Sequence, residues 1–138
     1  MGQREVRRWV AASPSHVFEA VSELVLAGHW LAAGDRGQAL CAAALSVGTT
    51  ITCPLRHGIC QLCIRELDPT RSLTCEVVAF GHSVRACVTI ASQHEGSLLA
   101  CVTEYCAPSN MPEHRALRRI ANAFGQMPAD IKRIIETR

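Results

Sequence analysis

Aromatic side chains are scarce in this chain of 138 residues, since one tyrosine, two tryptophans and three phenylalanines make up only 4% of it. Binding of single-stranded nucleic acid relies on aromatic platforms beside a strongly basic surface. The formal net charge is only +2, so we do not expect nucleic acid as a partner. No apolar run reaches the roughly 18 residues of a membrane helix, so we do not expect stable membrane insertion either.

Several signatures of targeting and catalysis are also missing. The N-terminal stretch MGQREVRRWV is charged and has no apolar run behind it, which argues against a secretory signal. Neither a glycine-rich phosphate loop nor a G-x-S-x-G motif occurs, which counts against nucleotide chemistry and serine hydrolysis. We expect a cytoplasmic protein with one domain over residues 1–138, because a hydrophobic content of 49% suffices for a sizeable core. The sequence leaves the oligomeric state open.

Cysteine, in contrast, is abundant, with eight residues in all and three within CPLRHGICQLC at residues 53–63. In the cytoplasm thiols stay reduced, so these cysteines do not imply disulfides. Cys60 and Cys63 have the C-x2-C spacing of zinc sites. The residues around them alternate as in a strand, however, and residues three apart in a strand point to opposite faces. We therefore predict no metal site and no cofactor, and interpret the cysteines as small buried apolar residues.

The order of elements follows from periodicity and turn signals. Residues 4–12 fit a strand, and Ser13 with Pro14 fits the N-cap and first position of a helix that ends near Gly28. Turn signals then separate short strands over residues 38–106, which predicts an antiparallel meander. The expected strands are QALCAAAL, for which a helix is the alternative, and TTITCPL, GICQLCIREL, SLTCEVVAF, SVRACVTIAS and SLLACVTEYCA.

The C-terminal residues, from about 112 to 138, form an amphipathic pattern typical of one long helix. The apolar stripe keeps its phase across Pro128, which favours a kinked but continuous helix. The fold class is therefore α+β, a curved antiparallel sheet gripping a long C-terminal helix, with short helices after the first strand. A curved sheet does not close completely against a straight helix, so we expect a cavity between them, a typical site for apolar small molecules.

The sequence resembles the START-like helix-grip superfamily (SRPBCC), including its polyketide cyclase/dehydrase and coenzyme Q-binding families. The resemblance lies in the order and spacing of motifs over nearly the whole chain: VAASPSHVFEAVSEL, HWL at 29–31, LSVGTTITC, ELDPTRSLTCEV and EGSLLACVTEY. It implies a helix-grip fold with a deep apolar pocket, and functions from lipid carriage to cyclisation of poly-keto chains. It supplies no catalytic motif that matches residue for residue.

Alternation along the strands predicts which side chains face the cavity. Cys60 and Leu62 belong to the apolar set of their strand, and Gln61 and Cys63 to the outer set. The last strand is ambiguous, because the set with Glu104 and the set with Tyr105 both contain apolar residues, and a one-residue shift exchanges them. The candidate ligand-binding residues are Arg8, Trp30, Cys60, Leu62, Cys75, Val77, Val88, Tyr105, Phe124 and Met127.

Three polar residues are candidates for chemistry. His29 could act as a proton donor or base at the mouth of the cavity, or it is a surface residue beside a structural Trp30. Glu104 could act as a buried base with a raised pKa, or it is exposed near an edge. Arg8 lies on the apolar side of the first strand, where it would need an anionic partner if buried or would reach water from the strand end.

The leading hypothesis is a protein that binds an apolar or polyaromatic small molecule between sheet and helix. If it is an enzyme, we expect a polyketide cyclase or dehydratase type of reaction, in which the site holds a flexible chain in a reactive fold and excludes water. Two alternatives stay open. One is a carrier or sensor of a lipid or quinone without catalysis, and the other is an interaction module with a filled core.

Overall fold

The computed structural model describes residues 2–27, 46–55, 58–105 and 114–137. In chain order its elements are β1 (Gly2–Val10), α1 (Pro14–Ala27), β2 (Thr50–Leu55), β3 (Gly58–Asp68), β4 (Ser72–Ala79), β5 (His82–Gln93), β6 (Gly96–Tyr105) and α2 (His114–Glu136). The strand expected at residues 4–12 and the five expected from TTITCPL onward, six in all, are therefore present within this part. The predicted strand QALCAAAL lies outside the described residues.

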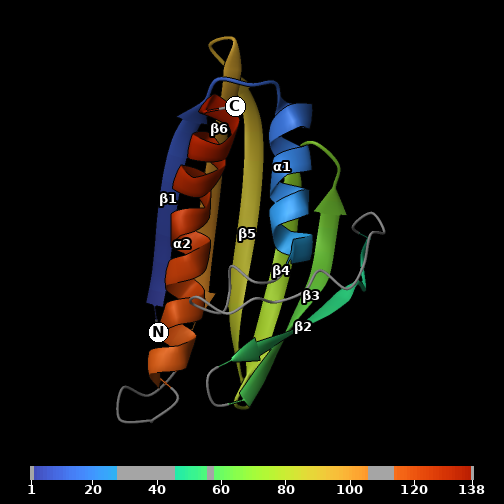
Figure 1. Ribbon diagram of the computed structural model, residues 1–138, viewed down its shortest axis with the longest axis vertical. Coiled ribbons are helices and arrows are strands. Elements are labelled where there is room, and N and C mark those ends of the chain that lie inside the picture. The colour runs from blue at the N-terminus through green and yellow to red at the C-terminus, as the bar shows by residue number, and fades with distance from the viewer. Residues whose placement is uncertain (1, 28–45, 56–57, 106–113, 138) are drawn as a thin grey trace.

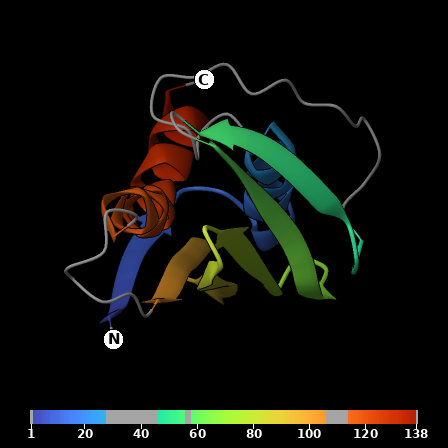
Figure 2. The ribbon, with the colours of Figure 1, turned by 90° about the horizontal axis from the view of Figure 1, so that it is seen from below.

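One six-stranded sheet holds all the strands in the order β1-β6-β5-β4-β3-β2. Every neighbouring pair is antiparallel, and β1 pairs with β6. The sheet is strongly curved, and both helices lie on its hollow side (Figures 1 and 2). The predicted α+β class, a curved sheet gripping the C-terminal helix, is confirmed. Among the described helices, none is long and apolar enough to cross a membrane.

The tight hairpins match the twist of this sheet. Phe80-Gly81 joins β4 to β5 and His94-Glu95 joins β5 to β6, and all four residues have positive φ values of 55°, 78°, 48° and 63°. Two-residue turns with positive φ at both positions have the twist that antiparallel strands need. They keep consecutive strands adjacent, so the sheet grows in chain order from β2 to β6.

Helix α1 begins as its sequence predicts. The amide of His16 donates to the Ser13 hydroxyl over 3.3 Å, which caps one of the free N–H groups of the first turn. Pro14 occupies the first helical position, where a missing N–H has no cost. Val17, Val21 and Val25 are fully buried, so the helix presents one apolar stripe to the sheet.

Helix α2 continues through Pro128 as a single helix, as the unbroken apolar phase predicts. The residues of the predicted stripe are all buried: Leu117, Ile120, Ala121, Phe124, Ile131 and Ile135. Arg115, Arg119 and Arg133 are exposed on the other side. This helix packs against β1, β6 and β5, and α1 packs against β5 and β6.

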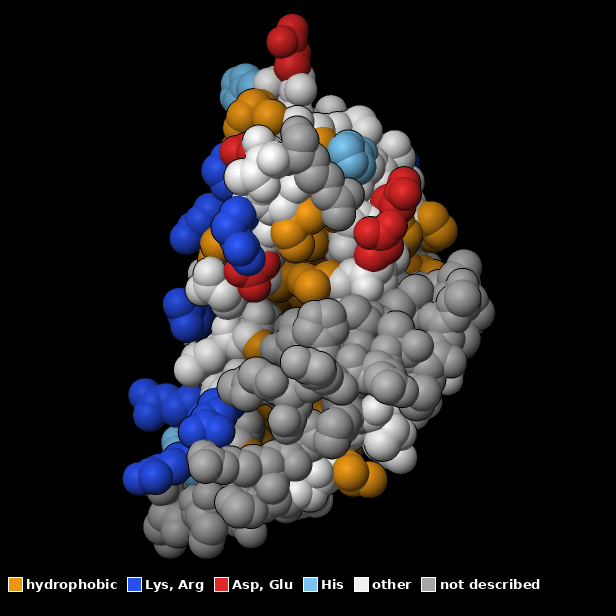
Figure 3. Space-filling model, viewed as in Figure 1, with side chains coloured by type: hydrophobic (Ala, Val, Ile, Leu, Met, Phe, Trp, Pro, Cys, Tyr) orange, Lys and Arg blue, Asp and Glu red, His pale blue; other side chains and the backbone are white. Residues whose placement is uncertain are grey.

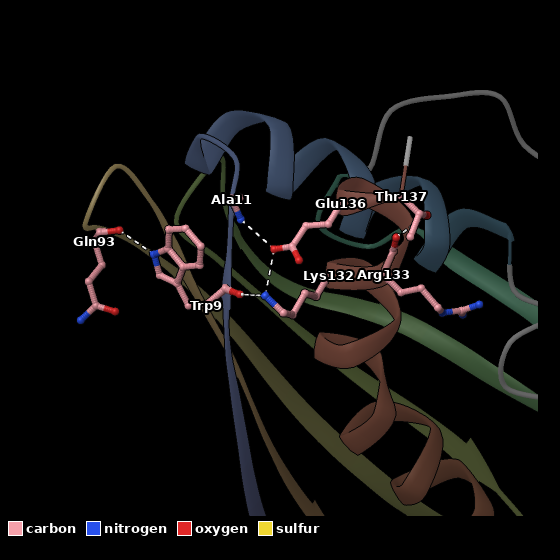
Figure 4. Close-up of polar contacts among 7 residues, drawn as sticks. All are labelled: Trp9, Ala11, Gln93, Lys132, Arg133, Glu136 and Thr137. Carbon is pink, nitrogen blue, oxygen red and sulfur yellow. Dashed lines mark hydrogen bonds and ion pairs between the residues drawn. The ribbon is translucent and has the colours of Figure 1, made fainter.

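Polar contacts fasten the C-terminal end of α2 to the end of β1 (Figure 4). The Lys132 ammonium donates to the backbone carbonyl of Trp9 over 2.8 Å and pairs with the Glu136 carboxylate at 2.9 Å. The same carboxylate accepts from the amide of Ala11 at 3.1 Å. Trp9 in turn donates from Nε1 to the carbonyl of Gln93 at 2.8 Å. The helix end, the first strand and the β5–β6 hairpin are thereby held together.

Candidate functional site

The inner face of the sheet, which faces the helices, is a continuous apolar surface made by alternate residues of β3 to β6. Its buried members are Cys60, Leu62, Ile64, Leu73, Cys75, Val77, Ala79, Val84, Ala86, Val88, Ile90, Leu99, Cys101 and Thr103. The alternation expected from the sequence therefore holds in β3, β4 and β5. Cys60 is fully buried on this face, and Cys63, which is three residues later and only half-buried, lies on the other.

The pairing of β6 resolves the ambiguity in the last strand. Cys101 lies opposite Val88, and Tyr105 lies opposite Val84, both of which belong to the inner face. Directly opposed residues of antiparallel strands share a face, so the set with Tyr105 is the inner one. Glu104 therefore lies on the outer face, opposite Arg85, and is exposed. Its placement offers no support for a base between the sheet and the helices, and its catalytic role stays a prediction.

Arg8 lies opposite Leu99 and so belongs to the inner face of edge strand β1, but it is exposed. Its guanidinium donates to the carbonyl of Arg7 over 2.7 Å. Of the two alternatives for Arg8, the placement matches the one in which the long side chain reaches water. The other polar candidate, His29, and its neighbour Trp30 lie outside the described residues.

On the helix side, the candidates Phe124 and Met127 are fully buried in α2. The strands against which α2 packs are β1, β6 and β5, while four candidate residues, Cys60, Leu62, Cys75 and Val77, lie on β3 and β4. Sheet order puts these two strands on the other half of the sheet. The candidate residues are therefore divided between helix α2 and the half of the sheet that lies away from it.

The buried thiols of the inner face are chemically quiet. Burial raises the pKa of Cys75, with a smaller contribution from the neighbouring Cys101 and Cys87 thiols. Burial also raises the pKa of Cys101 to about 11, although its hydrogen bond with Thr103 acts in the opposite direction. The nucleophile in cysteine chemistry is the thiolate, so at neutral pH these two side chains act as apolar wall and not as reacting groups.

Sequence reasoning missed His114, the first residue of α2. It lies three residues before the buried Leu117, on the same side of the helix, and is itself half-buried. Its ring lies beside that of Tyr105, with ring centroids 6.3 Å apart and planes at 42°. Its Nδ1 atom is buried without a hydrogen-bond partner, alone among the side-chain nitrogens and oxygens of the described residues. Such an atom typically costs about 1–3 kcal/mol, which makes this end of the interior distinctive.

The same end of α2 is rich in positive charge. Arg115, Arg118 and Arg119 are exposed in its first two turns, and the first turn holds no acidic residue. In Figure 3 basic side chains gather along the margin of the molecule on the side of α2 and β1. Within the described residues, none of these three arginines forms an ion pair. The positive end of the helix dipole adds to their field, so this end favours electron-rich groups.

Comparison with known proteins supports the fold. No protein-family model matches the sequence, and no curated protein matches it. Solved structures do match: protein MLL2253 from Mesorhizobium loti superposes with a TM-score of 0.72 at 14% identity, over 99% of this chain and 98% of that one. Ara h 8.0201 superposes with a TM-score of 0.64 at 11% identity, over 99% of each chain.

A third similar structure is DynU16, a protein of the dynemicin biosynthetic locus, with a TM-score of 0.67 at 15% identity. It aligns over 98% of this chain but only 47% of its own length. Likeness at such low identity establishes architecture and not activity. Together with the sheet order and the position of α2, it shows that this chain has a helix-grip fold.

Proposed function

We propose that this helix-grip chain binds an apolar or polyaromatic small molecule between the inner face of its sheet and helix α2. The observation that carries the proposal is the composition of the inner face. On β3 and β4 it combines the small and medium side chains of Cys60, Cys75, Val77 and Ala79 with those of Leu62, Ile64 and Leu73, all almost fully buried. Such a surface on the hollow side of the sheet, beside the strands against which α2 packs, suits a ligand that is held by apolar contact and oriented by a few polar groups.

The proposal extends to a class of reaction. A fold of this kind would act on a poly-keto-like substrate mainly by holding the flexible chain in a reactive conformation away from water. The similarity to DynU16, whose gene lies in the dynemicin biosynthetic locus, supports this direction. In such a reaction His29 is the proposed group for proton transfer. The buried thiols Cys75 and Cys101 are not proposed to react, because their pKa values are raised.

A carrier or sensor of a lipid or quinone is the alternative function for the same site. It requires the same apolar walls but no reacting group, and the described part of the interior contains few polar side chains. The two functions differ in the effect of His29→Ala. In an enzyme this change lowers product formation and leaves ligand affinity nearly unchanged. A carrier forms no product, and the change leaves its ligand affinity as it was.

Binding itself can be tested with a matched pair of substitutions on one strand. Val77 is fully buried on the inner face, and its neighbour Val78 is 42% exposed on the outer face. N-phenyl-1-naphthylamine, a dye that fluoresces in apolar surroundings, would be titrated into the wild type, Val77→Phe and Val78→Phe. We expect Val77→Phe to weaken dye binding at least tenfold, about 1.4 kcal/mol, because the added ring occupies ligand space. Val78→Phe should leave the affinity unchanged.

The stability of the same variants separates a ligand site from a filled core. A well-packed core resists extra atoms, and an added ring there costs about 1–3 kcal/mol. If Val77 borders ligand space, Val77→Phe should change the free energy of unfolding by less than about 1 kcal/mol. Absence of dye binding in the wild type, combined with a large loss of stability in Val77→Phe, would contradict the proposal and favour the packed interaction module.

A further inference from the structure

We propose that His114 binds the polar end of the ligand, through a hydrogen bond between its Nδ1 atom and a hydroxyl or carbonyl oxygen. This inference rests on the proposed binding of an apolar molecule in the same interior, and it names the ligand class more narrowly. The ligand would be an apolar or aromatic molecule with an oxygen group at the end that lies beside Tyr105 and the start of α2.

The Nδ1 atom of His114 is buried and has no hydrogen-bond partner among the described residues. Buried polar atoms in folded proteins nearly always have a partner, and an exception calls for an explanation such as a missing water or ligand. A neutral imidazole has one donor and one acceptor nitrogen, so Nδ1 suits either a carbonyl or a hydroxyl group, depending on the tautomer.

This atom lies where helix α2 meets strand β6. His114 is half-buried in the first turn of α2, three residues before the buried Leu117, and Tyr105 is on the inner face of β6, opposite Val84. The contact between the two rings joins the helix wall to the sheet wall. The Nδ1 atom of His114 therefore lies where helix α2 meets the inner face of the sheet, the two walls of the proposed site.

Exposed arginines place positive charge at this end of the helix. Arg115 and Arg118 are exposed beside His114, without an ion pair in the described part of the chain. Their positive field, added to that of the helix N-terminus, favours an electron-rich oxygen over an ammonium group. The inner face further along the sheet, with Cys75, Val77 and Val88, offers only apolar contact. Polar recognition is thus concentrated at one end.

The test uses two probes of nearly the same shape, 2-naphthol and 2-methylnaphthalene, which displace N-phenyl-1-naphthylamine from the protein. We expect the wild type to prefer 2-naphthol by about tenfold, the size of one buried hydrogen bond. His114→Phe should abolish this preference by weakening 2-naphthol alone. His114→Leu is a second variant in case the first folds poorly. His114→Asn, whose amide lies close to the position of Nδ1, should retain part of the preference.

His16→Phe is the matched control, because His16 is exposed on α1 and should leave both affinities unchanged. Melting of the ligand-free protein adds a second readout. Replacing an unsatisfied buried atom by an apolar ring should raise the Tm of His114→Phe by about 3 °C, whereas a purely structural histidine would give a lower Tm.

The outcomes distinguish this inference from the proposed function. If the wild type binds neither probe nor the dye, the proposed function fails and this inference fails with it. If both probes bind and the preference for 2-naphthol is absent, or survives in His114→Phe and His114→Leu, the proposed function stands and the role of His114 is wrong. A lower Tm with an unchanged preference would likewise overturn it.

Discussion

Gly96, the first residue of β6, provides a sharp test of how the sheet is held to helix α2. A Cβ atom added at this position would lie 2.5 Å from the carbonyl oxygen of Val10 and 2.6 Å from Cζ2 of Trp9. Ordinary contact begins at about 3.4 Å, so the indole ring or the β1 backbone would have to move by about 0.8 Å. Neither movement is free, because Trp9 is bonded to Gln93 and Lys132.

The cost of Gly96→Ala can be estimated from the contacts that the movement breaks. The Trp9 Nε1 bond to the carbonyl of Gln93, now 2.8 Å, contributes about 1 kcal/mol. The Lys132 ammonium, 5.6 Å from the indole centroid, contributes about 0.5–1 kcal/mol at an exposed site. Adding a part of the about 1–3 kcal/mol typical of overpacking, we expect a loss of about 2–4 kcal/mol.

Urea unfolding of Gly96→Ala in the wild-type and Trp9→Val backgrounds measures this loss and its source. In the Trp9→Val background the loss should shrink by at least about 1 kcal/mol, because residues in contact are coupled energetically. Gly81→Ala is the control, since a Cβ there meets nothing within 4 Å and only its φ of 78° opposes the change. A loss below about 0.5 kcal/mol, or one that is equal in both backgrounds, would refute the reasoning.

Two further predictions concern ionisable groups. Lys132→Met should lower the free energy of unfolding by about 1 kcal/mol, through loss of its bonds to Trp9 and Glu136, whereas Arg133→Met at an exposed position should have little effect in the same denaturant titration. Hydrogen bonds from Lys132 and Ala11 lower the pKa of Glu136 in the folded protein. The contribution of Glu136 to the free energy of unfolding is therefore present above the ordinary pKa of 4.5 and is lost as pH falls through the lowered pKa. Lys132→Met should make stability less dependent on pH in this acid range. Burial raises the pKa of Cys101 from 9.0 to about 11, so the unfolded chain ionises first and stability should fall between these values as pH rises. Titrations at several pH values should show a shallower fall for Cys101→Val, and an identical fall in both proteins would contradict the prediction.

Much of the fold was predictable because it depends on local periodicity. The start of α1 at Ser13 and Pro14 follows from the chemistry of helix N-termini, and the structure places both residues as predicted. The stripe of α2 remains in phase across Pro128, so continuity of the helix was also predictable. In β3, alternation alone separated Cys60 from Cys63, and it thereby removed the apparent zinc spacing from consideration.

The faces of β6 were not predictable, because both sets of alternate residues in SLLACVTEY are largely apolar. Local pattern cannot distinguish two registers that bury similar side chains. Pairing with β5 made the choice, and it moved Glu104 to the outer face and Tyr105 to the inner one. The exposure of Arg8 also depends on how the strands assemble. Strand β1 lies at the edge of the sheet, where side chains can reach water.

By itself, the sequence determined the class of fold and the walls of the proposed site, since helix and strand periodicities report which side chains turn inward. Only the tertiary structure decided how those walls meet. Tyr105 and His114 are nine positions apart and belong to different elements, so no periodicity relates them. Their contact arises because β6 and α2 pack together, and burial then leaves Nδ1 of His114 without a hydrogen-bond partner among the described residues. Burial and hydrogen bonding are properties of the assembled interior. For this reason the sequence alone could not predict that His114 Nδ1 is a buried atom without a partner in the described part of the chain.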